Sequence, residues 1–574
     1  MKQRTMEKAL GGVALEEISL SKNIEQIHFE TTLPIQQLAI QAVEEVGPRV
    51  YELVGLKDEL RFFVLGCQGM GDNSQQQVAQ LMHDKVSESP EKKPDFILFL
   101  GDNIYKFGAK DPQDLGFIKY FYNIYHKSEL GSIKGIPGFT ILGNHDENRH
   151  KQSFLAPNWP HGKAAGLNQT AHTYIPQAYS AKIFNSVAEL KKLFSQEKLS
   201  CNELPLWNMP YYFYSLIAGK LQFFCLNSNS LVKDYLELKL AESDKNKLQD
   251  LTRKGTNQTL WLRENWQKAR DAGRTIALAL HHPFKTQGVR AFRNFYDTKQ
   301  YLSYDDVKNL NGILHSNTES YNELLALIFE NEGMQPDFVL AAHDHNMSFF
   351  KDEKLCQIGA GGGGGKLQRR QSFKDQLNTG CFLSNLGFVS VSCPIEHPKE
   401  MVFEFFTTAH HHMKFSLDSR FPKREPTEDE TLETFREIVL QASDAYLLSL
   451  HPAQDPTKTS DESYFQYLGH LTSNIYHQIS HLFQREVPSD IDLIQDLLAY
   501  FHQPKLEFLS EVKNYFCWLV EQLEEKNGTG FMHFFNLTFD QSPSFAASEK
   551  LRGLREDINT VLCHMPNLSL HLAN

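Results

Sequence analysis

Residues 337–346 read DFVLAAHDHN, an apolar run that ends in two histidines, His343 and His345. A short apolar run bounded by polar residues is typical of a strand that is buried on both faces. The chain carries 24 histidines, so this pair alone is weak evidence for a metal site. The pair indicates a metal site only if other strands also end in carboxylate, amide or imidazole side chains.

Several other short apolar runs have the same form. They are RFFVLG, DFILFLG, GFTILG, LQFFCLN and TIALAL, between residues 61 and 280. Most are separated by segments with helical periodicity, such as residues 73–86 and 258–273. Strands that alternate with helices predict an α/β sheet packed between helical layers. The runs at 355–361, 388–393 and 401–409 have no long helix between them and predict a second sheet of antiparallel strands.

The length of 574 residues predicts more than one domain. Residues 1–59 are expected to form an N-terminal extension, helical at 34–54 and otherwise irregular. Residues 60–418 contain the apolar runs. The segment 420–433 is charged and contains proline, which marks a boundary. Beyond it, residues 428–574 carry apolar positions at i, i+3, i+4 and i+7 and predict an all-α domain without a catalytic constellation.

The composition excludes several classes of protein. Hydrophobic residues make up 41% and charged residues 22% of the chain, which favours a large packed core over disorder. The net charge of -12 argues against general nucleic-acid binding. No apolar stretch is long enough to predict a membrane span. The N-terminus has no apolar signal region, and the eight cysteines show no disulfide framework, so we expect a cytoplasmic protein, or one exported without an N-terminal signal peptide.

Polar motifs follow four of the predicted strands. Their residues are Asp102, Asn103 and Tyr105 in GDNIY, Asn144, His145 and Asp146 in GNHD, His281 and His282 in HHPF, and His343 and His345 in HDHN. Strand ends of an open α/β sheet converge on one crevice, so we expect these side chains to meet. Such ligands suit zinc, manganese or iron. Two such ions about 3.5–4 Å apart can clamp a phosphoryl group, which predicts metal-assisted phosphoester hydrolysis.

The motifs G-D-x-x-Y, G-N-H-D, H-x-P and A-H-D-H-N, in this order, resemble those of the calcineurin-like metallophosphoesterases. The tyrosine of GDNIY and the AHDHN sequence are most similar to the purple acid phosphatases of the short, tartrate-resistant type. The resemblance covers about residues 60–410 and does not include the C-terminal helices. It implies a four-layer α/β/β/α sandwich and a phosphatase that uses two metal ions, Zn, Mn or Fe.

The resemblance also implies a role for each motif residue. Asp102 would bridge both ions. Tyr105, as tyrosinate, and His345 would bind the first ion, and Asn144, His281 and His343 the second. His145 would be the acid or electrostatic group that helps the leaving oxygen depart. A metal-bound hydroxide would be the nucleophile.

One position departs from the family pattern. The family places a metal-binding aspartate after the first strand, and here Cys67 follows RFFVLG. Its thiolate could ligate a metal and favour zinc over ferric iron. Alternatively, the first site is weakened and the protein binds one ion or has lost catalysis. Asp72 could replace Cys67 as a ligand only if its loop folds back toward the site. The simplest interpretation of Cys67 is a small buried residue at the end of a strand.

The glycine-rich stretch GAGGGGGK at 359–366 does not match a phosphate-binding P-loop, because Ala360 and Leu367 occupy required positions. We expect a flexible loop that lines the substrate cleft. The basic segment 366–374 either steers an anionic substrate or is a solvated loop.

Three hypotheses about function follow. The first is a metallophosphatase acting on a phosphorylated small molecule or a phosphoprotein. The second is a catalytically degenerate member of the fold that acts as a binding or scaffolding module, with a protein partner at the C-terminal helices. The third is a phosphodiesterase or nucleotidase with the same metals. A chain of this composition without a signal peptide would suit a bacterial effector.

Overall fold

The structure is a computed structural model that describes residues 35–45, 49–149, 159–176, 184–288, 290, 298, 300–368 and 379–419. The predicted all-α region, residues 428–574, and the protein partner expected there lie outside the described residues. The described part contains an α/β fold built on two mixed sheets. No helix among the described residues is long and apolar enough to cross a membrane.

The larger sheet has nine strands in the order β13-β11-β12-β10-β9-β8-β7-β1-β5. In that order their bounds are Thr379–Leu383, Met347–Lys351, Cys356–Ala360, Phe338–Ala341, Thr275–Ala279, Leu221–Cys225, Tyr214–Ala218, Val50–Val54 and Lys198–Ser200. Strands β12, β10, β9 and β8 run parallel to one another. Three pairs are antiparallel: β11 with β12, β13 with β11, and β7 with β8. The central parallel strands are buried along their whole length, as their continuous apolar sequences predict.

The smaller sheet has seven strands in the order β16-β15-β14-β2-β3-β4-β6. In that order their bounds are His412–Ser416, Val402–Thr407, Gly387–Pro394, Glu59–Leu65, Phe96–Phe99, Gly138–Thr140 and Trp207–Asn208. Strands β2, β3, β4 and β6 are parallel, and β14, β15 and β16 add antiparallel pairs at the other side of β2.

Aromatic side chains join the two sheets face to face. Phe223 of the nine-stranded sheet lies edge-on to Phe62 of the seven-stranded sheet, with ring centroids 5.2 Å apart. Further along, Phe338 and Phe403 make a similar contact at 5.6 Å. All four rings are fully buried. Aromatic residues dominate core energetics, and edge-to-face pairs add to the area that they bury, so these contacts hold the strand ends of both sheets in fixed relation.

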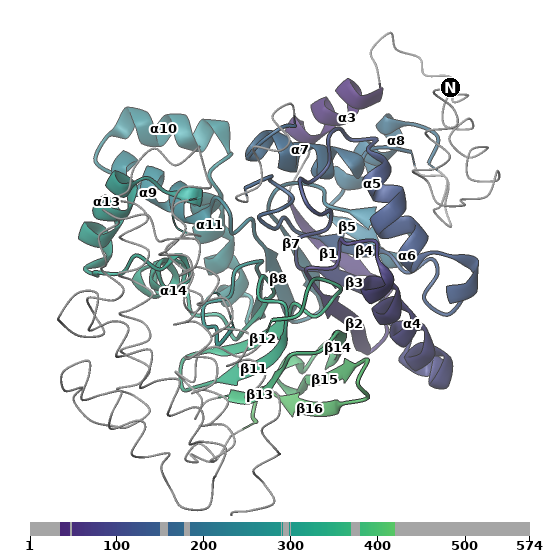
Figure 1. Ribbon diagram of the computed structural model, residues 1–574. Coiled ribbons are helices and arrows are strands. Elements are labelled where there is room, and N and C mark those ends of the chain that lie inside the picture. The colour runs from purple at the N-terminus through teal and green to yellow at the C-terminus, as the bar shows by residue number, and fades with distance from the viewer. Residues whose placement is uncertain are drawn as a thin grey trace, which may run out of the picture. The chain divides into compact units, whose positions relative to one another are not determined.

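Helices cover the outer faces of the sheets. Helix α4 contacts β14 and β15, and α11 contacts β9. Figure 1 shows α9, α10, α11, α13 and α14 gathered beside the nine-stranded sheet and α4, α5 and α6 beside the seven-stranded sheet. The bounds are α3 Ile35–Glu44, α4 Asn73–Glu88, α5 Leu115–Phe117, α6 Asn123–Tyr125, α7 Lys163–His172, α8 Val187–Phe194, α9 Leu231–Ala241, α10 Lys245–Lys254, α11 Gln258–Asp271, α13 Tyr304–Leu314 and α14 Tyr321–Asn331.

The apolar runs predicted as strands are confirmed as β2, β3, β4, β8, β9 and β10, and the helical segments 73–86 and 258–273 as α4 and α11. The helical prediction for residues 34–54 is right for α3 and wrong for residues 50–54, which form β1. Gly47 and Pro48 interrupt the helical pattern there. Strand β1 pairs with β5 and β7, so the nine-stranded sheet includes residues that we assigned to the N-terminal extension.

The prediction of a separate antiparallel sheet at 355–409 is also partly wrong. Strands β14 and β15 are antiparallel, but β14 pairs with β2 and so extends the sheet that also holds β3 and β4. Strand β12 belongs to the other sheet, where it runs parallel to β10. Sequence spacing shows that long helices are missing between these strands, but it does not show which sheet edge each strand joins.

Candidate metal centre

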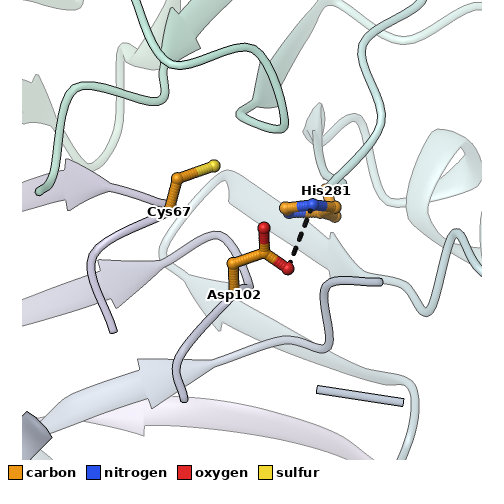
Figure 2. Close-up of side chains that lie close together, drawn as sticks. All are labelled: Cys67, Asp102 and His281. Atoms are coloured by element: carbon orange, nitrogen blue, oxygen red, sulfur yellow. Dashed lines mark ion pairs between the residues drawn. The ribbon is translucent and has the colours of Figure 1, made fainter. Parts of the chain in front are cut away.

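The polar motifs meet where strands of both sheets end. Asp102 and Asn144 follow β3 and β4 of the seven-stranded sheet, while His281 and His343 follow β9 and β10 of the nine-stranded sheet. We expected the strand ends of one sheet, and the structure instead brings together the ends of two. A hydrogen-bond contact of 2.8 Å between His281 Nδ1 and Leu100 O joins the two sets of turns. Figure 2 shows Cys67, Asp102 and His281 directed toward one another.

Three residues of the centre have a left-handed backbone. The φ angles are 56° at Cys67, 57° at Asp102 and 67° at His343. Residues other than glycine seldom adopt this conformation, and the cost of about 1–3 kcal/mol each is tolerated where the surroundings impose it. At Cys67 the surroundings include a hydrogen bond from its own N–H to Gly101 O, at 2.9 Å. The sharp turns end each strand and direct the side chains into the centre.

His281 Nε2 lies at the middle of one group of ligand atoms. It is 3.2 Å from Asn144 Oδ1, 3.0 Å from His343 Nδ1 and 3.4 Å from Asp102 Oδ1. Because Leu100 O can only accept, His281 Nδ1 carries the ring hydrogen and Nε2 offers a lone pair. All four side chains are at most 3% exposed.

This group of atoms fits a metal ion. Asn144 Oδ1, Asp102 Oδ1 and His281 Nε2 are all hydrogen-bond acceptors. Acceptor atoms that face one another need a cation between them to bind their lone pairs. Metal bonds of about 2.0–2.2 Å place neighbouring ligand atoms about 2.8–3.6 Å apart, which matches the observed separations. The backbone carbonyl behind His281 is the kind of second partner that metal-binding histidines use. The structure therefore brings together the four residues predicted for the second metal.

The residues predicted for the first metal lie on the other side of Asp102. Tyr105 Oη donates to Asp102 Oδ2 at 2.8 Å and lies 3.1 Å from His345 Nε2. His345 Nδ1 is 2.7 Å from Lys366 O, so by the same argument His345 Nε2 offers a lone pair. Donor atoms of Cys67, Asp102 and His281 lie within 4.8 Å of one another.

The alternative ligand Asp72 does not reach the centre. Its side chain accepts hydrogen bonds from Ser74 N at 3.0 Å and Gln75 N at 3.2 Å, as the N-cap of α4. An N-cap carboxylate is held by the helix that it starts. Cys67 is therefore the only one of the two candidates that the structure places with Asp102.

Burial and local charge set the ionisation of the centre. For Asp102, burial acts to raise the pKa, but the His281, His145 and His343 imidazoles together hold that pKa well below its ordinary value. Burial, and then the charge of Asp102, raise the pKa of the Cys67 thiol and of the Tyr105 phenol. A bound cation would oppose both increases, because it favours thiolate and phenolate.

His145, the predicted acid, lies at the partly exposed side of the centre. Its ring is 4.4 Å from the Tyr105 ring, and its Nδ1 is 2.9 Å from Lys106 O. The carbonyl fixes the hydrogen on Nδ1 and leaves Nε2 as the atom that can exchange a proton with a ligand. The backbone N–H of His145 donates to Asp102 Oδ1 at 3.0 Å. The role of His145 stays a prediction.

Asp146 ties together the two turns of the seven-stranded sheet. Its carboxylate accepts from Gly143 N at 2.7 Å, Asn103 N at 2.9 Å and Ile104 N at 3.1 Å, and also from Gln169 Nε2 at 2.7 Å. Burial, and then the charge of Asp102, raise the pKa of Asp146 to about 7, and the hydrogen bonds limit that increase. The GNHD motif contained this residue without indicating its role.

Ser228 and His282 support the turns of the nine-stranded sheet. Ser228 Oγ accepts from His281 N at 3.3 Å and from His282 N at 3.2 Å, and it lies 2.9 Å from His282 Nδ1. The His282 ring then packs 4.3 Å from the His343 ring. The motifs did not mark Ser228, although residues 227–230 follow strand β8 and were a usable signal.

The glycine-rich loop is packed against the centre rather than flexible. Gly361 to Gly365 are buried, and Gly365 N donates to Cys67 O at 2.8 Å. A Cβ at Gly365 would lie 2.5 Å from His345 Cε1. The expectation of a flexible loop is therefore wrong. Gly363 and Gly365 are needed because the turn after β2 and the His345 ring occupy the space that side chains would fill.

Comparison with known proteins relates the chain to phosphoesterases. The chain is 30% identical over 119 residues to tartrate-resistant acid phosphatase type 5 of Sus scrofa, which is 20% of this chain and 34% of that protein. The chain thus spans about a third of the length of this relative. Among solved structures, GAP50, the anchor in the inner membrane complex of Plasmodium, matches with a TM-score of 0.37 and 17% identity, over 66% of this chain and 95% of that one. A dimetal phosphatase from Danio rerio matches with a TM-score of 0.30 and 10% identity, over 62% of this chain and 99% of that one.

The sequence model of the calcineurin-like phosphoesterases matches residues 60–347, which is half of the chain and contains the motifs GDNIY, GNHD, HHPF and HDHN. The chain belongs to the calcineurin-like phosphoesterase family.

Proposed function

We propose that this protein is a metal-dependent phosphoester hydrolase that acts on a phosphorylated small molecule or a phosphoprotein. The observation that carries the proposal is the convergence of Asn144 Oδ1, Asp102 Oδ1 and His343 Nδ1 on His281 Nε2, at 3.0–3.4 Å. Membership of the calcineurin-like family supports it. The proposal includes a four-layer α/β/β/α sandwich, which the contacts of α4 with β14 and of α11 with β9 support.

The protein would hold two ions, chosen among Zn, Mn and Fe, on the two sides of Asp102. One oxygen of Asp102 faces the His281 group and the other faces Tyr105. When bound, the ions would lower the pKa of a water and neutralise phosphoryl charge. His145 Nε2 would supply a proton to the departing oxygen, and Lys106 O would keep the ring in place.

A second candidate function is a binding or scaffolding module that uses the same fold without catalysis. Cys67 favours this alternative, because it stands where the family has an aspartate ligand. The two functions differ in whether the protein binds metal and turns over substrate.

The test compares wild type, His281→Ala and His126→Ala. Metal content is measured by mass spectrometry, and hydrolysis of p-nitrophenyl phosphate across pH. His126 is the matched control, because it is also buried and lies outside the motifs. We expect bound metal and turnover in wild type and His126→Ala, and loss of both in a folded His281→Ala protein. Metal without turnover in wild type would support the binding module. Unchanged metal and turnover in His281→Ala would refute the site.

A further inference from the structure

Cys67 is held rigidly with its side chain toward the centre. Its N–H donates to Gly101 O at 2.9 Å, and its carbonyl accepts from Gly365 N at 2.8 Å. The residue is fully buried and has a left-handed backbone, with φ of 56°. The conformation costs about 1–3 kcal/mol and is imposed by these backbone contacts, which fix the direction of the side chain.

The Cys67 sulfur belongs to a set of donors. Its Sγ lies within 4.8 Å of ligand atoms of both Asp102 and His281. Tyr105 Oη contacts Asp102 Oδ2 and His345 Nε2. The Cys67 sulfur and the Tyr105 hydroxyl therefore both lie near Asp102, and His345 contacts that hydroxyl, so these groups come from three separate turns of the chain.

We propose that Cys67 is a thiolate ligand of the first metal, and that it makes this position selective for zinc-like ions over ferric iron. The inference rests on the proposed function, because it assumes that the centre binds metal. It chooses between the two interpretations of Cys67 that the sequence left open. The structure supports ligation, since the Cys67 sulfur is buried and lies within 4.8 Å of ligand atoms of Asp102 and His281.

Coordination forms a sulfur–metal bond and breaks the S–H bond, and the proton passes to solvent. Cys67, Tyr105, His345 and Asp102 would hold the first ion. Thiolate is a soft ligand that suits zinc and cobalt(II) better than hard ferric iron. Without a ferric–tyrosinate pair, the isolated protein would not be purple.

The experiment uses cobalt(II) as a probe of sulfur ligation. The full chain is stripped with a chelator and loaded with cobalt(II), and absorption is recorded with cobalt content. Thiolate ligation gives an intense sulfur-to-cobalt charge-transfer band in the near ultraviolet, which oxygen and nitrogen ligands do not give. Wild type should show this band with two cobalt ions per chain. Cys67→Ser should lose the band and one ion.

The control is Cys393→Ser. Cys393 is equally buried but pairs with Leu60, near the start of β2, at the opposite end of the strand from Cys67. It should keep the band and both ions. A third variant, Cys67→Asp, restores the family ligand. It should lower the ratio of zinc to manganese affinity at the first position by at least about tenfold, because a carboxylate suits the harder ion.

The outcomes separate this proposal from the one on which it rests. No cobalt in wild type would refute the proposed function itself. Two ions without a charge-transfer band, or one ion without the band, would overturn thiolate ligation and leave a metal centre in place. A band that persists in Cys67→Ser would assign it to another cysteine and would also overturn the proposal. Equal zinc and manganese preferences in wild type and Cys67→Asp would refute the selectivity.

Discussion

His281 Nε2 lies 3.2 Å from Asn144 Oδ1, although the two residues are 137 positions apart and follow strands of different sheets. The contact exists because β4 and β9 end at the same place, and the aromatic core fixes the two sheets against each other. The geometry of the centre is therefore a property of sheet packing rather than of any one motif.

Removal of the Asn144 amide should weaken the second metal position. We expect Asn144→Ala to lower metal affinity by at least about tenfold, since loss of even a supporting partner around a metal commonly costs 10–100-fold. Competition with a chelator of known affinity measures the change. The control is Asn208→Ala, which removes a fully buried asparagine that is bonded to Gly138 O and Pro205 O. Equal affinities in the two variants would exclude Asn144 as a ligand.

Gly365 should be required for the first metal position. A methyl group in Gly365→Ala would lie 2.5–2.6 Å from the His345 ring, far inside normal contact distance. The His345 ring must shift, which disturbs its 3.1 Å contact with Tyr105, so we expect loss of one metal ion per chain. In the control, Gly312→Ala, no atom lies within 4 Å of the added group, and α13 tolerates alanine. If Gly365→Ala retains both ions, then His345 does not bind the first one.

Asp146 should stabilise the fold, because its carboxylate accepts hydrogen bonds from backbone N–H groups in the turns that follow β3 and β4. Asp146→Asn replaces one acceptor oxygen by a donor, so N–H groups that now bond to Asp146 lose their partner. Each unpaired buried donor costs about 1–3 kcal/mol, and we expect a loss of unfolding free energy in that range or above. Urea unfolding provides the measurement. Asp72→Asn is the control, because asparagine caps a helix about as well as aspartate and should change stability little. A loss no larger than the control's would show that Asp146 is dispensable.

Short-range patterns predicted much of this structure. The runs that became β2, β3, β9 and β10 are continuous and apolar, and each ends in a polar turn. Such strands can be predicted from local sequence alone, because a strand that is buried on both faces has a continuous apolar sequence. The same turns carry the predicted ligands, and the structure brings Asp102, Asn144, His281 and His343 together.

Long-range relations were not predictable in this way. The pairing of β1 with β7 depends on a neighbour more than 160 residues away, and the local pattern of residues 50–54 resembled a helix. The contact of Gly365 with His345 depends on how closely two turns approach, which sequence spacing does not encode. The sequence alone does not mark Ser228, because a serine after a strand is common. Its role comes from its position under the His281 and His282 N–H groups.

The buried histidines outside the centre should make stability depend on pH. Burial lowers the pKa of His126 and of His172 to about 3, while a histidine in an unfolded chain titrates near 6.5. Between these values the unfolded chain binds protons that the folded chain does not. Stability should therefore fall as pH decreases from about 6.5 toward 3, and these two groups should not affect it at higher pH.

The His172 ring shows why its protonation is costly. It stacks on Phe117 with centroids 3.5 Å apart, and its nitrogens lie 2.7 Å from Pro112 O and 3.1 Å from Tyr122 Oη. In His172→Gln, which cannot titrate, the dependence of unfolding free energy on pH should be shallower by up to about 1.4 kcal/mol per pH unit between pH 4 and 6. Urea unfolding at several pH values measures how the unfolding free energy changes with pH. A chelator in the buffer removes any contribution from bound metal. His411→Gln, in which an exposed ring is removed, should keep the wild-type slope. Identical slopes in wild type and His172→Gln would mean that His172 is protonated equally in the folded and unfolded chains, against the effect of its burial.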